Sequence, residues 1–599
     1  MRLKYIFLLG IAITALTACD LNEYPQDSIS PETFFKTEKE LKLYSNQFYT
    51  VLPDASDLYQ EMSDHIVHGL SYNDAVRGYA RQVPSTGGGW SFTALRHINY
   101  FLQNLYRCEN EEVKKRYEGL ACFWRAYFYF TKLQRFGDTP WYDQVVTNDN
   151  NELLYKERDS REVIIQHIIE DLDKAAVQLP ETSENKYIVN RYAALALKAR
   201  ACLYEGTFRK YHAGTVFNPT NLPYTYLLEA SAIAAKEIIN SGKYEIFQTG
   251  ENPYYKFFVN KENKEKEIIL ARSYGVATHE ASAFALVASK GAAGFTRAFA
   301  LTYLMNDGSR FTDKPGYDKM PLNEETINRD PRMSQTMLTK RFTFIDGSTS
   351  LFRKELSITG YPVVKFVEGS TAISGSHVDI PIFRFAEVCL NYAEALAELG
   401  SITQTDIDIS INKLRDRVNM PHLSLTEANA NPDPFLMSND YGYKNVDKGE
   451  NCGVILEIRR ERGIELVMEG FRYQDLIRWR EITRFDNQNA DGTSNGREFF
   501  GPYVPGKGRY DMDSDGEIDF VVNPESGRGY PAPAGVKSVT INKDIFLSEG
   551  DKGYIISLQD MIRRHDEQRD YLYPIPITEL TLSRGKLTQN PGWDDINRK

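Results

Sequence analysis

The segment from residue 117 to 131 limits the fold most narrowly, because its apolar side chains cover every face of a helix. One face carries, at intervals of three or four residues, Tyr117, Leu120, Trp124, Phe128 and Thr131. Phe123, Tyr127 and Phe130 occupy the other faces. A helix that is apolar all round is buried. We expect it to end at Gly137, a suitable C-terminal cap, because Pro140 cannot continue it.

Two further helical patterns carry small residues where two helices could touch. Asn190 is placed to cap an alanine-rich helix that runs to Tyr204, and a second helix covers 230–238 and ends at Gly242. Small residues at these spacings let two helices approach closely and antiparallel. This is the style of a tetratricopeptide helix pair, although no strict 34-residue period covers the chain. The pattern predicts degenerate helical repeats.

The composition fits a folded soluble protein and argues against nucleic-acid binding. Hydrophobic residues make up 42% and charged residues 26% of the 599 residues, which is ordinary for a globular chain. The net charge is −11 and the isoelectric point is near 5.5, whereas nucleic acid requires a clustered basic face. The chain holds 37 Tyr and 32 Phe but only 5 Trp. Tyrosine-rich loops are also typical of sugar- or peptide-binding surfaces.

The first two dozen residues predict export and lipid anchoring. A positively charged start precedes an apolar run from Tyr5 to Leu16, which is shorter than the about 20 residues of a membrane span. Leu16-Thr-Ala-Cys19 matches the lipobox of bacterial lipoproteins. We therefore expect residues 1–18 to be a signal peptide and Cys19 to carry the lipid, with a soluble body behind it. The alternative is ordinary cleavage beside an incidental cysteine.

Five cysteines remain after lipidation, and their number and spacing fit neither a disulfide framework nor a zinc site. Cys202 and Cys389 lie in apolar helical patterns, where they would pack as small hydrophobic side chains. A bridge between Cys108 and Cys122 stays an open alternative.

Four stretches of the C-terminal half carry a resemblance to a known family. They are Arg384-Phe-Ala-Glu-Val-Cys-Leu-Asn-Tyr-Ala-Glu-Ala395, Ile411-Asn-Lys-Leu-Arg-Asp-Arg417, the run from Arg459 to Arg478, and Leu587-Thr-Gln-Asn-Pro-Gly592. The first three lie in helices that the spacing predicts over 384–399, 411–418 and 454–482. Together with the lipobox, and in this order, they make the chain similar to the SusD/RagB-like outer-membrane nutrient-binding lipoproteins of Bacteroidetes.

The resemblance implies a fold class and a division of the chain. The fold would be all-α, with tetratricopeptide-like helix pairs forming a right-handed superhelical scaffold and with large irregular loop regions. Residues 19–255 would form an N-terminal SusD-like region and residues 256–599 a C-terminal RagB/SusD region. Loop insertions are expected near 429–453 and 486–540.

The resemblance also implies a function and a partner. The protein would face the cell exterior on the outer membrane, held by its lipid anchor alone. It would capture an oligosaccharide or polysaccharide without catalysis or a required cofactor, and deliver it to a TonB-dependent SusC-like transporter. The alternatives are a peptide or another nutrient as ligand, a secreted glycosidase, and a tetratricopeptide scaffold for periplasmic proteins.

Three glutamates offer the strongest argument for an enzyme. Glu457, Glu461 and Glu465 recur every four residues, so that their side chains lie about 5–6 Å apart on a helix, near the separation in a retaining glycosidase. The neighbouring arginines would lower the carboxyl pKa values, opposite to the need of a general acid. We therefore predict no catalytic residue and a structural ion-pair network, with the pairs Arg462–Glu465, Glu469–Arg472 and Asp475–Arg478.

Alternating carboxylates after residue 510 match the first part of a calcium loop. Carboxylates occupy positions 1, 3 and 5 of such a loop, and Gly516 stands at the sixth. The twelfth position is Val522 instead of the bidentate glutamate, so a solvated acidic turn is the alternative. The candidate calcium ligands are Asp511, Asp513, Asp515, Glu517 and Asp519.

Aromatic residues in glycine-rich stretches are the candidates for ligand contact, because flat rings stack on sugar faces. These are Tyr72, Trp90, Tyr274 and Phe295. The alternative for each is that the ring packs beneath its own loop.

Overall fold

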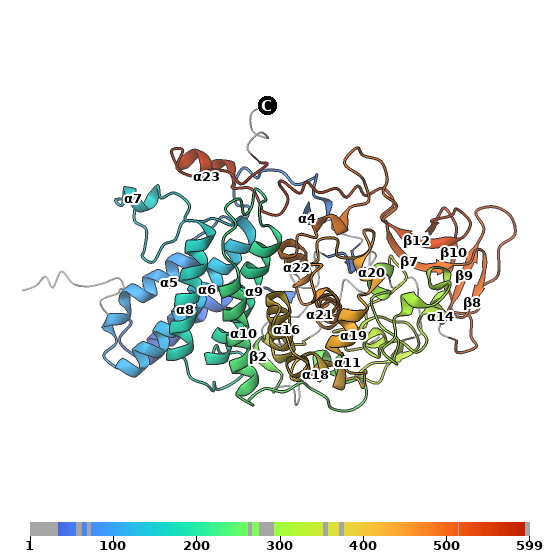
Figure 1. The fold of residues 1–599 in the computed structure, drawn as a ribbon, viewed down its shortest axis with the longest axis horizontal. Coiled ribbons are helices and arrows are strands. Elements are labelled where there is room, and N and C mark those ends of the chain that lie inside the picture. The colour runs from blue at the N-terminus through green and yellow to red at the C-terminus, as the bar shows by residue number, and fades with distance from the viewer. Residues whose placement is uncertain are drawn as a thin grey trace, which may run out of the picture.

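The computed structural model describes residues 34–55, 63–68, 74–260, 266–274, 293–350, 357–369, 377–512 and 514–593. Helices dominate the body, and the strands between residues 499 and 557 lie at one edge of it (Figure 1). One hydrophobic core extends from Phe35 through both halves of the chain to Leu572. The predicted helical scaffold is confirmed. The signal peptide 1–18 and Cys19 lie outside the described residues.

The N-terminal part is almost entirely helical. Its elements are α2 (Glu38–Ser45), η1 (Asn46–Val51), α4 (Asp74–Arg77), α5 (Thr93–Asn104), η2 (Leu105–Arg107), α6 (Glu111–Phe136), α7 (Asn151–Leu154), α8 (Arg161–Gln178), α9 (Arg191–Tyr211), α10 (Thr225–Asn240) and α11 (Pro253–Val259). Helix α6 contains the segment that is apolar on every face, and it ends at the predicted cap, where the Gly137 N–H donates to Leu133 O. Asn190 caps α9 as expected, because its side chain accepts from the Ala193 N–H at 3.0 Å.

The helices pack in sequence order, so that α6 contacts α8, α8 contacts α9 and α9 contacts α10. Alanines allow the close approach of α9 and α10, and the Ser231 hydroxyl donates to Ala199 O across their contact at 2.8 Å. The next contact of α10 is with α16 (Phe385–Leu399), although residues 241–384 separate them in sequence. Helix α16 then packs against α21 (Cys452–Glu465), so one row of helices joins both halves (Figure 1).

The C-terminal part has shorter helices. They are α13 (Arg297–Ala300), η4 (Phe311–Asp313), η5 (Tyr317–Lys319), α14 (Leu322–Glu325), α15 (Arg332–Thr336), α17 (Gln404–Asp408), α18 (Ile411–Asp416), α19 (Leu425–Ala430), α20 (Pro434–Met437), α22 (Arg472–Arg478), η7 (Ile482–Phe485) and α23 (Ile577–Leu582). Within the segment 429–453, α20 lies between the end of α19 and the start of α21.

The sheets are small and pair distant parts of the chain. Three two-stranded sheets join β1 (Ile66–Val67) with β3 (Gly294–Phe295), β2 (Ile268–Arg272) with β6 (Ile380–Arg384), and β4 (Phe342–Thr343) with β5 (Thr349–Ser350), all antiparallel. Two three-stranded sheets, in the orders β11-β12-β7 and β10-β9-β8, contain β7 (Phe499–Val504), β8 (Gly508–Tyr510), β9 (Phe520–Asn523), β10 (Ser538–Thr540), β11 (Phe546–Leu547) and β12 (Gly553–Ser557).

Two expectations need correction. The segment 486–540 is not one large loop, because β7 to β10 lie within it. The helix expected over 454–482 is two helices, α21 and α22. The chain turns between them at Met468 and Gly470, which have positive φ angles of 63° and 80°, and no continuous helix admits that conformation.

After β12 the chain returns to the N-terminal helices (Figure 1). The Tyr573 N–H donates to Arg135 O at 2.8 Å, and the Ile577 N–H donates to Pro84 O at 3.0 Å. We call residues 563–593 the C-terminal strap. It holds α23 beside the loops that precede α5 and follow α6.

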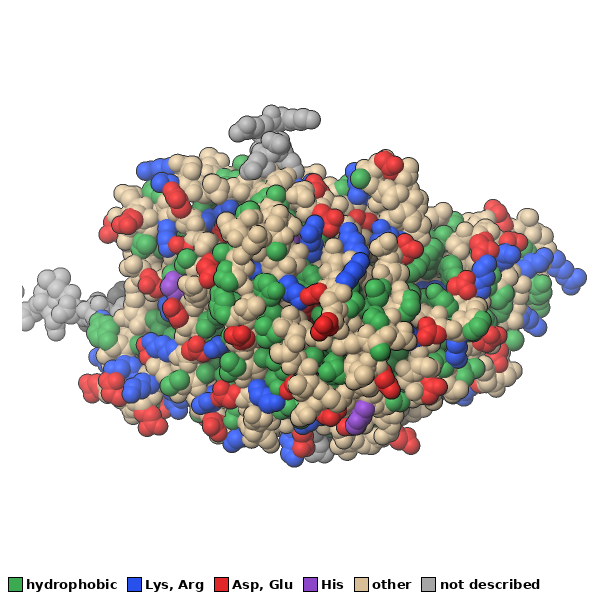
Figure 2. Space-filling view, viewed as in Figure 1, with side chains coloured by type: hydrophobic (Ala, Val, Ile, Leu, Met, Phe, Trp, Pro, Cys, Tyr) green, Lys and Arg blue, Asp and Glu red, His purple; other side chains and the backbone are tan. Residues whose placement is uncertain are grey.

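All five cysteines that the structure describes are buried and unpaired, so Cys108 and Cys122 are not bridged here. Burial raises the pKa of the Cys202 and Cys389 thiols to about 12, and both pack as small hydrophobic side chains, as predicted. Among the described residues, no helix has the length and apolar character needed to cross a bilayer. Acidic and basic side chains are interspersed over the face that Figure 2 shows.

Candidate functional site

The structure places three of the four predicted ligand-binding aromatics. Phe295 is fully buried in β3, and Tyr274 is 5% exposed, with its hydroxyl oxygen accepting from the Ala55 N–H at 2.9 Å. Both therefore pack inside the fold instead of facing a ligand. Tyr72 lies outside the described residues. Trp90 alone combines a packed ring with the wall of a surface groove.

Three consecutive glycines position Trp90. Residues 87–89 all have positive φ angles, between 57° and 86°, a region that other residues rarely adopt. Arg135 Nε donates to Gly88 O at 2.9 Å, and Lys132 Nζ donates to Gly89 O. The Trp90 ring then packs edge-on against Phe136, with ring centroids 4.9 Å apart. The glycine run thus forms a turn that Arg135 and Lys132 hold against α6.

The groove beside Trp90 has a volume of about 590 Å³ and brings four segments together. The start of α5, the loop after α6, the region of α7, and α23 with the following residues each form part of its wall. We call it the Trp90 groove. Its aromatic wall consists of Trp90, Phe92, Tyr142 and Tyr155. Its volume lies within the about 300–1,000 Å³ of small-molecule sites.

Neutral amides accompany these rings. Asn99 Nδ2 donates to the carbonyl oxygens of Tyr142 at 2.9 Å and Gln144 at 3.1 Å, which holds that loop against α5. Asn99 is 1% exposed, and its Oδ1 has no hydrogen-bond partner among the described residues. Buried polar atoms are normally paired, so this oxygen is an acceptor for a ligand hydroxyl or a water molecule. Gln144 and Asn148 line the same wall and are exposed.

Of the residues that line this groove, the sequence predicted only Trp90 as a ligand contact. Phe92, Tyr142, Tyr155 and Asn99 lie on three segments whose spacing along the chain gives no sign that they meet. Only the Tyr142 region carried a signal, because it follows the turn at Gly137 and Pro140. The contribution of α23 requires the return of the C-terminal strap.

Glu457, Glu461 and Glu465 are ion-pair partners inside the fold. Glu457 is 7% exposed, Glu461 1% and Glu465 0%. Although burial alone would raise the pKa of Glu465, Arg417, Arg384 and Arg332 together hold that pKa below its usual range. The Glu465 carboxylate accepts from Arg417 at 2.6 Å and from Arg384 at 2.8 Å. A general acid needs the opposite shift.

Only one of the three predicted ion pairs forms. Asp475 pairs with Arg478 at 2.8 Å. Arg462 pairs with Asp475, also at 2.8 Å, instead of with Glu465. Arg472 pairs with Asp64 at 2.6 Å, while Glu469 pairs with Lys365 and Arg384. Glu469 lies in the turn before α22, so its helical spacing to Arg472 is lost. Arg462 and Glu465 both lie in α21, but each pairs with a residue of another segment instead.

The acidic segment lies in the connection between β8 and β9. The Asp511 carboxylate accepts from the N–H groups of Asp515 at 3.2 Å and Gly516 at 2.8 Å. Asp515 also pairs with Arg341 at 3.1 Å, and Asp519 accepts from the Met512 N–H. Asp513 lies outside the described residues, and among those described no three His, Cys, Asp or Glu side chains converge as a metal site. Calcium binding by Asp511, Asp513, Asp515, Glu517 and Asp519 stays a prediction.

Family models match most of the chain. The model described as the SusD family covers residues 251–593, which is over half of the sequence. A second model, described as starch-binding and associating with the outer membrane, covers residues 71–203.

Individual relatives and solved structures agree with these matches. SusD-like protein P38 of Formosa agariphila is 23% identical over 80% of this chain and 91% of its own length. A SusD-like protein of Bacteroides fragilis has the same fold, with a TM-score of 0.68 at 21% identity over 95% of this chain and all of that one. A second structure from that species, titled a SusD-like carbohydrate-binding protein, has a TM-score of 0.65 at 20% identity over 92% of this chain and 99% of that one. The chain belongs to the SusD family.

Proposed function

We propose that the protein is a non-catalytic glycan-binding lipoprotein that captures an oligosaccharide in the Trp90 groove. The groove carries the proposal, because its wall offers the two features that sugar binding uses: aromatic side chains, of which Tyr142 and Tyr155 are partly exposed, and neutral amides such as Asn99. Family membership adds support, since one solved relative is titled a carbohydrate-binding protein and another a surface glycan-binding protein of Bacteroides fluxus.

The location and the partner belong to the same proposal. We infer that Cys19 anchors the chain on the exterior of the outer membrane and that the bound glycan passes to a TonB-dependent SusC-like transporter. The lipobox and the family description that names the outer membrane support the location. The buried pairing of Glu457, Glu461 and Glu465 leaves these carboxylates unsuited to hydrolysis, and it supports binding without catalysis.

Affinity electrophoresis of the purified protein through gels that contain single polysaccharides tests the ligand class. We expect at least one glycan to retard the wild type. The variants Trp90→Ala and Tyr155→Ala should bind about tenfold more weakly, because each loses a ring face. Tyr530→Ala is the matched control, since its ring is 39% exposed and lies outside the groove. Equal retardation of all four proteins would place the glycan elsewhere.

A peptide is the second candidate ligand, because apolar side chains are exposed on the wall of the groove. Leu154 is 41% and Leu582 64% exposed, and such surfaces suit apolar side chains better than hydroxyls. Calorimetry with a mixed tryptic digest in place of glycan separates the two ligands. Binding that Leu582→Ser abolishes and that no glycan competes would favour the peptide.

A further inference from the structure

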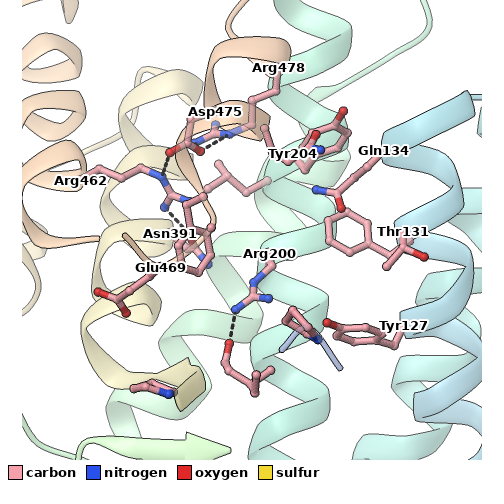
Figure 3. Close-up of a pocket in the computed structure, with 18 residues that line it drawn as sticks. Tyr127, Thr131, Gln134, Arg200, Tyr204, Asn391, Arg462, Glu469, Asp475 and Arg478 are labelled. Carbon is pink, nitrogen blue, oxygen red and sulfur yellow. Dashed lines mark hydrogen bonds and ion pairs between the residues drawn. The ribbon is translucent and has the colours of Figure 1, made fainter. Parts of the chain in front are cut away.

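A second pocket, separate from the Trp90 groove, lies where the two halves of the chain meet. Helices α6 and α9 form one side, and β6, α16, α21 and α22 form the other (Figure 3). We call it the seam pocket. Its volume is about 250 Å³, and it shares no residue with the Trp90 groove. It is smaller than the about 300–1,000 Å³ of sites for drug-sized ligands.

The arginines that line the seam pocket are already neutralised. Arg200 pairs with Glu387 at 2.6 Å. Arg462 pairs with Asp475 at 2.8 Å (Figure 3). Arg478 pairs with Asp475 and Glu394. No guanidinium that lines this pocket is therefore free to bind a carboxylate or phosphate, and a charged ligand would have to break an existing pair.

Two polar atoms in the pocket have no partner among the described residues. They are the hydroxyl of Tyr204, whose residue is 3% exposed, and Oε1 of Gln474. Burial raises the pKa of Tyr204, so its hydroxyl keeps its proton and can donate. Gln474 Oε1 can only accept. An unpaired buried polar group costs about 1–3 kcal/mol. A ligand that forms a hydrogen bond with each of these two atoms removes that cost.

A hydroxyl group satisfies both requirements, because it accepts one hydrogen bond and donates another. The rings of Tyr127, Phe130 and Phe471 add apolar atoms to the lining. Tyr127 and Phe130 are 7% and 3% exposed, and the Arg200 guanidinium lies over the Phe471 ring, 4.9 Å from its centroid. The side chain of Arg200 is 17% exposed, so the pocket is open to solvent. The volume of the pocket, its paired arginines, the Tyr204 donor and the Gln474 acceptor thus all fit a small uncharged molecule that carries hydroxyl groups.

We propose that the seam pocket binds one small uncharged polyhydroxylated molecule, the size of a single sugar ring, which donates to Gln474 and accepts from Tyr204. This site is independent of glycan capture in the Trp90 groove. Because both halves of the chain contact the ligand, binding should stabilise their contact and raise the melting temperature.

The proposal is tested by ligand-observed NMR and thermal melting of the purified full-length protein. The ligands are D-glucose, D-galactose, D-mannose and D-xylose. D-glucuronate serves as the charged counterpart. We expect saturable binding of at least one neutral sugar, with glucuronate about tenfold weaker because it meets no free guanidinium. Tyr204→Phe and Gln474→Leu should each weaken binding up to about tenfold, the value of one hydrogen bond. Tyr303→Phe, at a buried tyrosine outside the pocket, should bind as the wild type does.

Three results would overturn the assignment. The first is that no neutral sugar binds, which would mean that the pocket holds only water. The second is tighter binding of glucuronate than of glucose, or unchanged binding in Tyr204→Phe. The third is loss of monosaccharide binding in Trp90→Ala with retention in Tyr204→Phe, which would move the sugar to the Trp90 groove and leave the proposed function intact.

Discussion

Asn590 donates a hydrogen bond from Nδ2 to the main-chain carbonyl oxygen of Phe136 at 3.0 Å. The same amide donates to Tyr573 O at 2.7 Å, and its Oδ1 accepts from Arg158 Nη1 at 2.7 Å. Asn590 is only 2% exposed, so water cannot replace these bonds. One side chain near the end of the chain therefore fastens the C-terminal strap to the last turn of α6.

Replacing Asn590 by alanine should lower the free energy of unfolding by about 3 kcal/mol, because two buried carbonyl oxygens lose a donor. Urea denaturation followed by circular dichroism measures the change. Asn240→Ala, at the exposed end of α10, is the control and should change stability by less than about 0.5 kcal/mol. Equal effects of the two substitutions would show that the strap adds little stability.

Glu481→Gln should stabilise the protein at pH 8 but not at pH 5. Burial raises the pKa of Glu481 from 4.5 to about 7, and its Oε2 has no partner among the described residues. Between pH 4.5 and about 7 the folded state therefore binds more protons at Glu481 than the unfolded state does. The free energy of unfolding falls as the pH rises through this range. The shift corresponds to about 3 kcal/mol. Thermal melts at pH 5, 6.5 and 8 measure the gain.

Glu394→Gln is a matched variant for which we expect the opposite dependence of stability on pH. Burial alone would raise the pKa of Glu394, but Arg478 and Arg462 lower it to about 2. This carboxylate therefore contributes stability above about pH 4.5 that is lost as the pH falls toward 2. The variant should be destabilised by about 3 kcal/mol at pH 7, since Arg478 loses one of its two charged partners and keeps Asp475. If both variants shifted alike with pH, titration of these two groups would not be the cause.

Calcium binding by the acidic segment predicts a rise in melting temperature on addition of calcium chloride, because binding to the folded state alone stabilises it. Asp511→Asn should abolish the rise, since Asp511 stands at the first ligand position. Magnesium chloride at equal ionic strength controls for screening. A wild-type melting temperature that calcium leaves unchanged would identify the segment as a solvated acidic turn.

Lipidation at Cys19 predicts that cells fed radiolabelled palmitate label the wild-type protein and not Cys19→Ser. On intact cells, external protease should remove the wild-type protein if it faces outward. Equal labelling of both proteins would contradict the anchor. Labelling without protease sensitivity would keep the anchor and place the protein on the periplasmic face.

Local signals in the sequence predicted local structure well. The all-round apolar pattern of α6, its end at Gly137, and the Asn190 cap all follow from residues a few positions apart, and the structure confirms each. The break between α21 and α22 was missed, although Gly470 marks it, because the apolar pattern continues on both sides. The strands of 486–540 were missed because β8 and β10 have only three residues each and β7 contains Gly501 and Pro502, which are uncommon inside strands.

The site was harder to predict, because it depends on contacts between distant segments. Trp90 was identified from its glycine run, but Tyr142, Tyr155 and Asn99 join it only through tertiary packing. Tyr274 and Phe295 stand in equally glycine-rich surroundings and are buried. Sequence alone does not distinguish a ring that covers a groove from one that lies beneath a loop.

The contact between α10 and α16 has a consequence for how the chain is made. Residues 241–384 must be synthesised before α16 can cover its side of α10, where Lys236 Nζ donates to the Tyr392 hydroxyl at 2.7 Å. Leu227 and Leu228 are covered earlier, because they pack against Gly206 of α9. An unfinished chain therefore presents one side of α10 without its partner helix, and partly packed chains of this kind are prone to aggregation until the second half is made.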